Sequence, residues 1–255
     1  MGRAVVQSLL RRKLAGKQDI IVSDVLAKSR DYIAKRYGVT VTAENAGAVK
    51  GADAVILAVK PHELVAAMRQ ISGALKSQLV ISIAAGISLE TLCRHLEHRV
   101  VVRAMPNTPA QVGKGMTVWT STGELSAPQH EMARSILSSL GEQQYFADEK
   151  YIDMATAVSG SGPAYVFLFI EALIEAGVHI GLPRDVAVKL VIETIVGSAD
   201  AMKKLALHPA ELKNMVTSPG GTTTEALLHL ESGGFRSLII GAVTAAYGKA
   251  RALGG

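Results

Sequence analysis

Apolar residues are spaced in two different ways along this chain, and the spacing changes near residue 147. Before that point, short apolar runs rich in β-branched residues alternate with amphipathic stretches. Such runs predict buried parallel strands, and the stretches between them predict helices. The predicted strands are 19–23, 53–58, 79–83 and 100–105. This alternation predicts a doubly wound α/β sheet.

After residue 147 the strand pattern ends, and apolar residues recur at helical spacing. A helix that is apolar most of the way round, as around 166–170, needs neighbours on most sides. We therefore predict a first domain over 1–147 and an all-helical domain over 148–255, which associates as an obligate dimer or an assembly of dimers. The predicted helices are 165–180, 183–205, 211–216, 222–230 and 235–252.

Composition narrows the class of protein. The chain is 49% hydrophobic and 19% charged, which is typical of a globular protein, and its single cysteine, Cys93, excludes an internal disulfide. No apolar run reaches the roughly 20 residues of a membrane span, since Glu171 interrupts the best candidate. The net charge is +5, but the basic residues are scattered. We expect a soluble, cytoplasmic protein with no nucleic-acid partner and no membrane partner.

The start of the chain resembles the middle of a dinucleotide-binding motif. That motif opens with a strand, a glycine turn and a helix whose N-terminus receives the pyrophosphate. Gly2 and the apolar residues after it match the last fingerprint glycine and its helix. We therefore expect a Rossmann-like sheet that lacks its first strand, with a start assigned to an internal methionine. Weak cofactor binding and an exposed sheet edge would follow.

Ser23 and Asp24 stand about 20 residues after the fingerprint, where an acidic residue accepts a ribose hydroxyl of NAD. Asp24 could equally cap the next helix. Its charge would repel the 2′-phosphate of NADP, whereas Ser23 with Lys28 or Arg30 could hold that phosphate. The sequence leaves NAD and NADP both open.

Five short motifs, taken in order, resemble the pyrroline-5-carboxylate reductase family. Three follow successive strands, at the edge where open α/β sheets bind ligands. The resemblance covers essentially the whole chain, and the last motif is its most specific part. The motifs are LAVKP at 57–61, SIAAG at 82–86, RAMPNTP at 103–109, SGSGPAY at 159–165 and SPGGTT at 218–223.

The resemblance implies an oxidoreductase that makes L-proline by reducing Δ1-pyrroline-5-carboxylate with NADPH or NADH, the last step of proline biosynthesis. It places Lys60 and its neighbours under the nicotinamide and Asn45 on the adenosine side. Asn45 could instead cap a helix, and Asn107 could brace its own turn. The implied cofactor residues are Gly2, Ser23, Asp24, Asn45, Ala58, Val59, Lys60, Pro61, Ala85, Gly86 and Asn107.

The last motif is the implied substrate site. A tight turn followed by threonines opens a helix, so backbone N–H groups and the helix dipole favour a carboxylate. The family position of Thr223 reaches the ring nitrogen, so Thr223 and Lys60 are the catalytic candidates. A plain helix N-terminus is the alternative interpretation. The implied substrate residues are Ser218, Gly220, Gly221, Thr222, Thr223 and Glu149.

No histidine or cysteine has metal-ligand spacing or the context of a catalytic base, so no metal is expected and catalysis would rest on holding two reactants in line. A β-hydroxyacid dehydrogenase is the nearest rival. That family carries a lysine and an asparagine after its glycine-rich turn, and 160–172 contains neither. The second rival is a dimerising relative with an impaired cofactor site, which titration with NADPH would distinguish.

Overall fold

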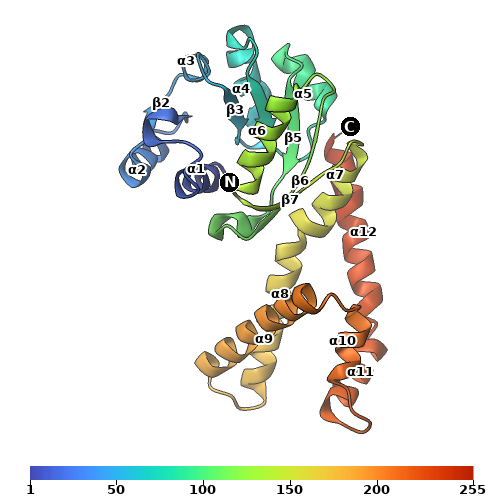
Figure 1. The fold of residues 1–255 in the computed structure, drawn as a ribbon. Helices are drawn as coiled ribbons and strands as arrows, with labels where there is room; N and C mark the ends of the chain where they lie inside the picture. Colours follow the sequence, from blue (N-terminus) through green and yellow to red (C-terminus); the bar gives the residue numbers. More distant parts are fainter. Residues whose placement is uncertain (255) are drawn as a thin grey trace. The chain divides into compact units, whose positions relative to one another are not determined.

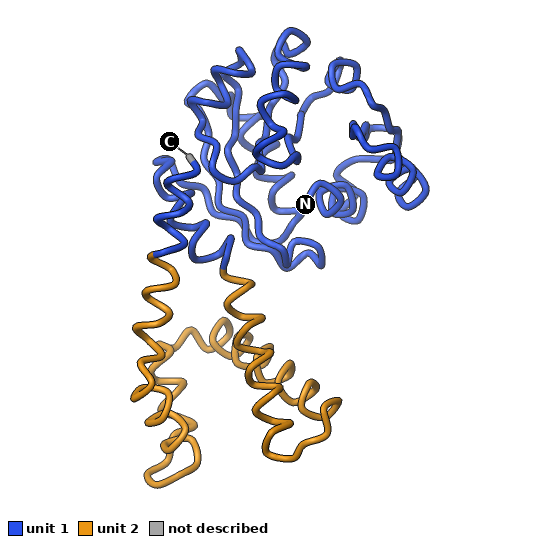
Figure 2. The backbone as a smooth tube through the Cα atoms, turned by 180° about the vertical axis from the view of Figure 1, so that it is seen from behind, with its two compact units in different colours: residues 1–161, 245–255 blue, residues 162–244 orange. Residues whose placement is uncertain are grey.

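The computed structural model describes residues 1–254, and the chain divides into two compact units (Figures 1 and 2). Unit 1 contains residues 1–161 and the end of the chain from residue 245, and unit 2 contains residues 162–244. The division differs from the predicted boundary at 147/148. The physical reason is that Glu149 and Asp153, which follow residue 147, form ion pairs with Arg103 of the sheet in unit 1.

Seven strands form two sheets in unit 1. A two-stranded parallel sheet pairs β1 (Ile21–Ser23) with β2 (Thr40–Thr42). The second sheet has the order β3-β4-β5-β6-β7, and within it only the pairing of β5 with β6 is antiparallel. All four predicted strands are confirmed, whereas β2, β6 and β7 were not predicted. The strands of the second sheet are β3 (Ala54–Leu57), β4 (Leu79–Ser82), β5 (Val101–Met105), β6 (Gly115–Ser121) and β7 (Gly141–Tyr145).

The Rossmann-like sheet is interrupted between β1 and β3, because no strand in the described residues pairs with both. Side chains beside the interruption show its effect. Ile21 on β1 is 47% exposed and Ile56 on β3 is only half-buried, whereas every residue of β4 is buried. Within residues 1–254, β1 and β3 are therefore edge strands, and such edges present unpaired backbone groups.

Helices cover both faces of the five-stranded sheet, as a Rossmann-like fold requires (Figure 1). On one face, Leu64 and Leu92 pack against Val80. On the other face, Leu137 packs against the fully buried Trp119. Pro61 and Ser88 begin their helices as predicted, and Ser88 accepts a hydrogen bond from the Thr91 N–H. The helices are α4 (Pro61–Ile71) and α5 (Leu89–Leu96) on the first face and α6 (Ala127–Ser138) on the second.

Helix α1 (Gly2–Arg11) contacts the core of each sheet. Val5 packs with Leu140 of the larger sheet's cluster, and Val6 packs with Ile33 of α2 (Ala27–Tyr37) beneath the smaller sheet. The buried hydroxyls of Ser8 and Ser139 are 2.7 Å apart and share a hydrogen bond. Apolar packing through α1 therefore takes the place of a continuous strand ladder.

Unit 2 is helical throughout, and each of the five predicted helices is found within three residues of its expected ends. Short helices complete unit 1. The remaining elements are η1 (Lys17–Asp19), α3 (Asn45–Ala48), η2 (Ser72–Ala74), η3 (Thr108–Val112), α7 (Lys150–Ala155), the π-helical turn η4 (Thr156–Gly160), α8 (Gly162–His179), α9 (Arg184–Leu205), α10 (Pro209–Met215), α11 (Thr222–Ser232) and α12 (Phe235–Gly254).

Unit 2 leaves large apolar side chains in contact with solvent. Phe167 is 60% exposed, and Leu168, Leu238 and Ile240 are each 67% exposed. One helical stretch, residues 150–179, is long and apolar enough to cross a membrane by length and composition. Its 18-residue apolar segment has a mean hydropathy of 1.5, and 6% of that segment is buried within the chain. The expectation that no stretch reaches this length was therefore wrong, although the core helix of a soluble protein passes the same test.

Candidate functional site

The predicted cofactor residues gather at the carboxyl ends of strands in unit 1. Ala58, Val59, Lys60 and Pro61 follow β3, and all four are exposed. Lys60 is the N-cap residue of α4. Its ammonium group forms no ion pair within the described residues, so it is available to an anionic ligand.

Gly2 lies at the N-terminus of α1, close to this loop. A Cβ atom at Gly2 would lie 3.2 Å from the Cβ of Ala58, so glycine permits the helix end and the loop to approach each other. The first N–H groups of a helix have no intrahelical acceptor, and they favour anions. This close approach fits the phosphate-bearing part of a dinucleotide.

The structure brings two predicted adenosine-side residues together. The Ser23 hydroxyl donates to Asn45 Oδ1 at 2.6 Å, and Asn45 Nδ2 donates to Gln70 Oε1 at 2.7 Å. The N-cap of α3 is Glu44, which makes no side-chain cap bond. The Asn45 side chain therefore joins β1 to α4.

Asp24 serves the turn that leads into α2. One of its carboxylate oxygens accepts the N–H of Leu26 at 2.9 Å, and Arg30 donates to the Asp24 carbonyl at 2.6 Å. The N-cap of α2 is Leu26, so the expectation that Asp24 could cap this helix was wrong: Asp24 braces the turn before the helix, and its charge stays beside Ser23.

The loop after β4 has a constrained backbone. Gly86 has a φ of +71°, a conformation that favours glycine. A Cβ there would come within 2.6 Å of the Leu253 Cβ, so the last turn of α12 packs on this loop. Gly86 is buried and Ala85 is half-buried, in contrast with the exposed loop after β3.

Asn107 uses both ends of its amide within the protein. Its Oδ1 accepts the Met116 N–H at 2.9 Å, and its Nδ2 donates to the Ser159 carbonyl at 3.0 Å. The side chain is buried, so it braces the turn after β5 and ties that turn to η4. The bracing interpretation accounts for both of these contacts.

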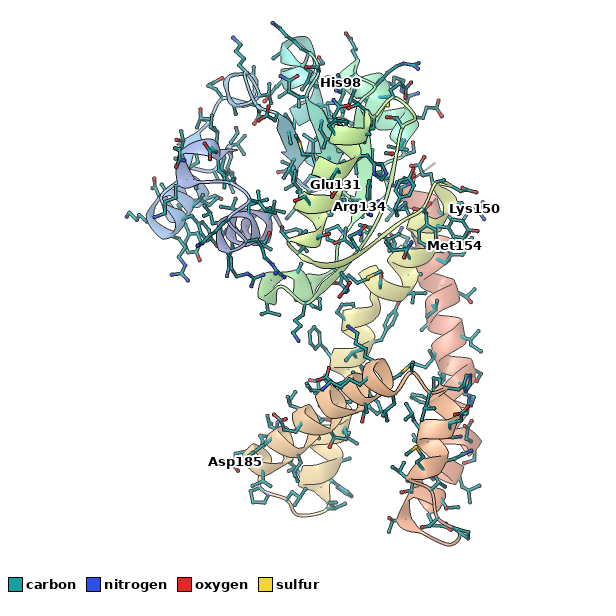
Figure 3. The ribbon with its side chains drawn as sticks, viewed as in Figure 1. His98, Glu131, Arg134, Lys150, Met154 and Asp185 are labelled. Carbon is teal, nitrogen blue, oxygen red and sulfur yellow. The ribbon has the colours of Figure 1, made fainter. Side chains whose placement is uncertain are left out.

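A partly buried cluster of ion pairs joins β5 to α7 and the residue before it. The Arg103 side chain is 3% exposed, and it donates to Glu149 Oε1 at 2.7 Å and to Asp153 Oδ1 at 2.6 Å. Glu149 Oε1 also accepts the Leu89 N–H at 2.8 Å. Lys150 and Met154, labelled in Figure 3, lie on α7, which follows Glu149 and carries Asp153. Arg103 lies in the RAMPNTP motif and was not among the predicted site residues, although a cation inside the apolar strand VVRAM is the signal that could have found it.

The predicted substrate loop lies entirely in unit 2. Gly220 has a φ of +66°, and a Cβ at Gly221 would meet the Ser218 Oγ at 2.4 Å. The Gly221 N–H donates to the Ser218 carbonyl at 3.0 Å, and the Thr224 hydroxyl donates to the same carbonyl at 2.6 Å. These contacts fix a tight turn at the start of α11.

Two threonine hydroxyls of this turn are not used for capping. The N-cap of α11 is Gly221, which has no side chain to accept a bond, and Thr222 and Thr223 are the first helical residues. Neither hydroxyl has a hydrogen-bond partner in the described part of the chain. Thr223 is half-buried, and the exposed Ser218 lies on the same turn. The turn can therefore present amide and hydroxyl donors to a small anion.

Other reactive groups offer no competing site. Burial, followed by the charge of Glu124, raises the pKa of the Cys93 thiol, so the group stays protonated at neutral pH. In residues 1–254, no three His, Cys, Asp or Glu side chains are grouped so that they could hold a metal ion. Within the described residues, the polar groups that could bind a ligand therefore lie mainly at the strand ends of unit 1 and at the α11 turn of unit 2.

Comparison with known proteins gives consistent matches for both units. Residues 149–253 match the family model described as pyrroline-5-carboxylate reductase dimerisation. Residues 1–86 match the model described as NADP oxidoreductase, coenzyme F420-dependent. The helical half is therefore similar to a self-association domain, and the first strands are similar to an NADP-binding unit.

Curated relatives and solved structures agree. A pyrroline-5-carboxylate reductase of Synechocystis sp. is 42% identical over 100% of this chain and 95% of its own length, and one of Pseudomonas aeruginosa is 41% identical over 93% and 88%. The Coxiella burnetii pyrroline-5-carboxylate reductase structure matches with a TM-score of 0.91 at 35% identity. The Plasmodium falciparum pyrroline carboxylate reductase structure, which has NADP bound, matches with a TM-score of 0.92 at 33% identity. Each structural match covers 100% of this chain and 95% of the other.

Proposed function

This chain belongs to the pyrroline-5-carboxylate reductase family, and from that premise we propose that it reduces Δ1-pyrroline-5-carboxylate to L-proline with NADPH. The reaction adds a hydride to the imine carbon and a proton to the ring nitrogen, and bound NADPH supplies the hydride. A protonated imine is already an electrophile, so the protein needs to hold and orient the reactants rather than provide a nucleophile.

The α11 turn is the observation that carries the proposal. The first N–H groups of α11 and its dipole favour the substrate carboxylate, and the open turn around Gly220 leaves them accessible. Thr223 would place its hydroxyl at the ring nitrogen, with Ser218 and Thr222 beside the carboxylate. The lack of a side-chain cap at Gly221 supports this assignment, because the hydroxyls remain available.

The strand ends of unit 1 would hold the cofactor. The N-terminus of α1 at Gly2 would receive the pyrophosphate, and the exposed Lys60 would attract a phosphate by its charge. The hydrogen-bonded pair of Ser23 and Asn45 would frame the adenosine side. Asn107 would hold the turn after β5 in place rather than contact the cofactor, because both ends of its amide are occupied.

Self-association would cover the apolar side chains of unit 2. The match to a dimerisation family model and the exposure of Leu168 and Leu238 both support an obligate dimer or an assembly of dimers. The same burial would account for the apolar helix within 150–179, so the proposal needs no membrane. A cytoplasmic location fits as well, because the lone Cys93 requires no oxidising compartment.

The test measures NADPH oxidation and proline formation together, with Δ1-pyrroline-5-carboxylate as substrate. We expect one proline for each NADPH oxidised. The carboxylate-free ring Δ1-pyrroline should react at least about 100-fold more slowly in kcat/KM, because the α11 donors lose their anion. Tight binding of the product proline without any NADPH binding in a fluorescence titration would instead favour a dimerising relative with an impaired cofactor site.

Asp24 offers a test of cofactor choice. In Asp24→Asn the amide oxygen can still accept the Leu26 N–H, while the negative charge near Ser23 is removed. We expect the KM for NADPH to fall about tenfold, because one repulsion with the 2′-phosphate is lost, and the KM for NADH to change less than about twofold. Steady-state kinetics with both cofactors checks this, and an equal change for both would remove Asp24 from cofactor selection.

A further inference from the structure

We infer that Glu149 is a positioning residue that ties the buried Arg103 of β5 to the first turn of α5, and thereby fixes the loop 85–88, which contains the implied cofactor residues Ala85 and Gly86. This inference rests on the proposed function for its kinetic consequence. The link itself is visible in unit 1 alone, because all of the residues involved belong to that unit.

Arg103 is placed where it can act as a rigid anchor. It sits in the middle of β5, where it is paired with Ser82 of β4 and with Thr120 of β6. Its side chain is 3% exposed, and its Nε has no partner among the described residues, so the two terminal nitrogens provide its hydrogen bonds. A buried guanidinium with a fixed fork holds carboxylates in a defined geometry.

The two carboxylates of the cluster are not equivalent. The Asp153 carboxylate accepts from Arg103 at 2.6 Å, and this is the one hydrogen bond of that carboxylate found in residues 1–254. Glu149 Oε1 is shared between Arg103 at 2.7 Å and the Leu89 N–H at 2.8 Å. The Leu89 N–H is one of the helix N-terminal donors that no intrahelical acceptor satisfies, so a charged acceptor there both satisfies it and favours the helix dipole.

The hydrogen bond from Leu89 to Glu149 connects the loop before α5 to the buried Arg103. Ser88 caps α5, and residues 83–87 connect that cap to β4, with Gly86 at a φ of +71° and packed against Leu253. The loop is therefore held at both ends, by β4 on one side and by Glu149 on the other. Without Glu149, the cap at Ser88 remains, but the first amide of α5 loses its tie to the sheet.

A pair of variants separates positioning from simple stability. In both Glu149→Ala and Asp153→Ala, Arg103 keeps one carboxylate, so each variant leaves a neutral pair. Only Glu149→Ala releases Leu89. We expect kcat to fall about tenfold in Glu149→Ala, with a larger deuterium isotope effect from C4-deuterated NADPH, because a misaligned hydride donor slows the chemical step. In Asp153→Ala, kcat should stay within about threefold of wild type.

Glu149→Gln tests whether the negative charge of Glu149 acts directly on the substrate or the cofactor. The amide oxygen can still accept the Leu89 N–H, so this variant should recover most of the kcat lost in Glu149→Ala. If Glu149→Gln is as slow as Glu149→Ala, Glu149 acts through its charge on substrate or cofactor and the positioning role is wrong. Equal kcat losses in Glu149→Ala and Asp153→Ala would also overturn it.

A measurement that needs no turnover keeps the inference distinct from the proposed function. Hydrogen–deuterium exchange should accelerate at least about tenfold for amides of 85–91 in Glu149→Ala and stay near wild type there in Asp153→Ala. Unchanged exchange in Glu149→Ala overturns the link, whatever the enzyme reduces. Accelerated exchange in a protein that does not reduce the imine would contradict the proposed function while leaving the link intact.

Discussion

Thr223→Ala is expected to lower kcat about 100-fold, while the dissociation constant for NADPH stays within about twofold of wild type. Thr223 is the second residue of α11, and its hydroxyl has no partner in the described residues, so the side chain contributes little to the fold. Its proposed bond is to the ring nitrogen, whose charge changes during reduction. Removing such a bond affects the transition state more than cofactor binding.

The matched control for this variant lies on the same helix. Ser232 is exposed near the end of α11, and its hydroxyl donates to the His229 carbonyl at 2.9 Å. Ser232→Ala should leave kcat within about twofold of wild type. Stopped-flow measurement of hydride transfer, combined with NADPH fluorescence titration, checks both variants. An unchanged kcat in Thr223→Ala would remove Thr223 from the mechanism.

The buried strands and the helices of unit 2 could be predicted because their apolar patterns are strong. β4 is LVIS and fully buried, and β5 is VVRAM. β7 was missed because GEQQY lacks an apolar run: it lies at the sheet edge with alternate residues exposed. β2 is only three residues long, which is too short for periodicity to define.

The sequence predicted which residues belong to the site better than it predicted the contacts between them. The motif at 218–223 indicated a helix start, and α11 begins at Thr222 as expected. Arg103 bonds residues 46 and 50 positions away, and Asn107 bonds Ser159, 52 positions away. No local pattern encodes such long-range pairs, because they depend on how α7 packs against the sheet. Because these bonds attach α7 to the sheet, the boundary between the two units lies after residue 161 rather than after residue 147.

Leu238→Asp combined with Ile240→Asp is expected to convert the assembly into single chains. Both side chains lie on α12 and are 67% exposed within one chain. In a two-fold dimer each change occurs twice, so four large apolar side chains would be lost from the interface. At about 1.5 kcal/mol or more for each, the loss is about 6 kcal/mol, which raises the dissociation constant about 10⁴-fold.

The control for the dimer variant carries the same change in charge. Lys203→Ala combined with Lys204→Ala also makes each chain more negative by two charges, at exposed positions on α9. Sedimentation velocity at micromolar concentration should show single chains for the aspartate variant and the wild-type assembly for the control. Because unit 2 of the single chain would keep its apolar helices in water, the aspartate variant should also unfold at a lower temperature than the control. An aspartate variant that sediments like wild type would mean that α12 lies outside the interface, and another apolar surface of unit 2 would have to supply it.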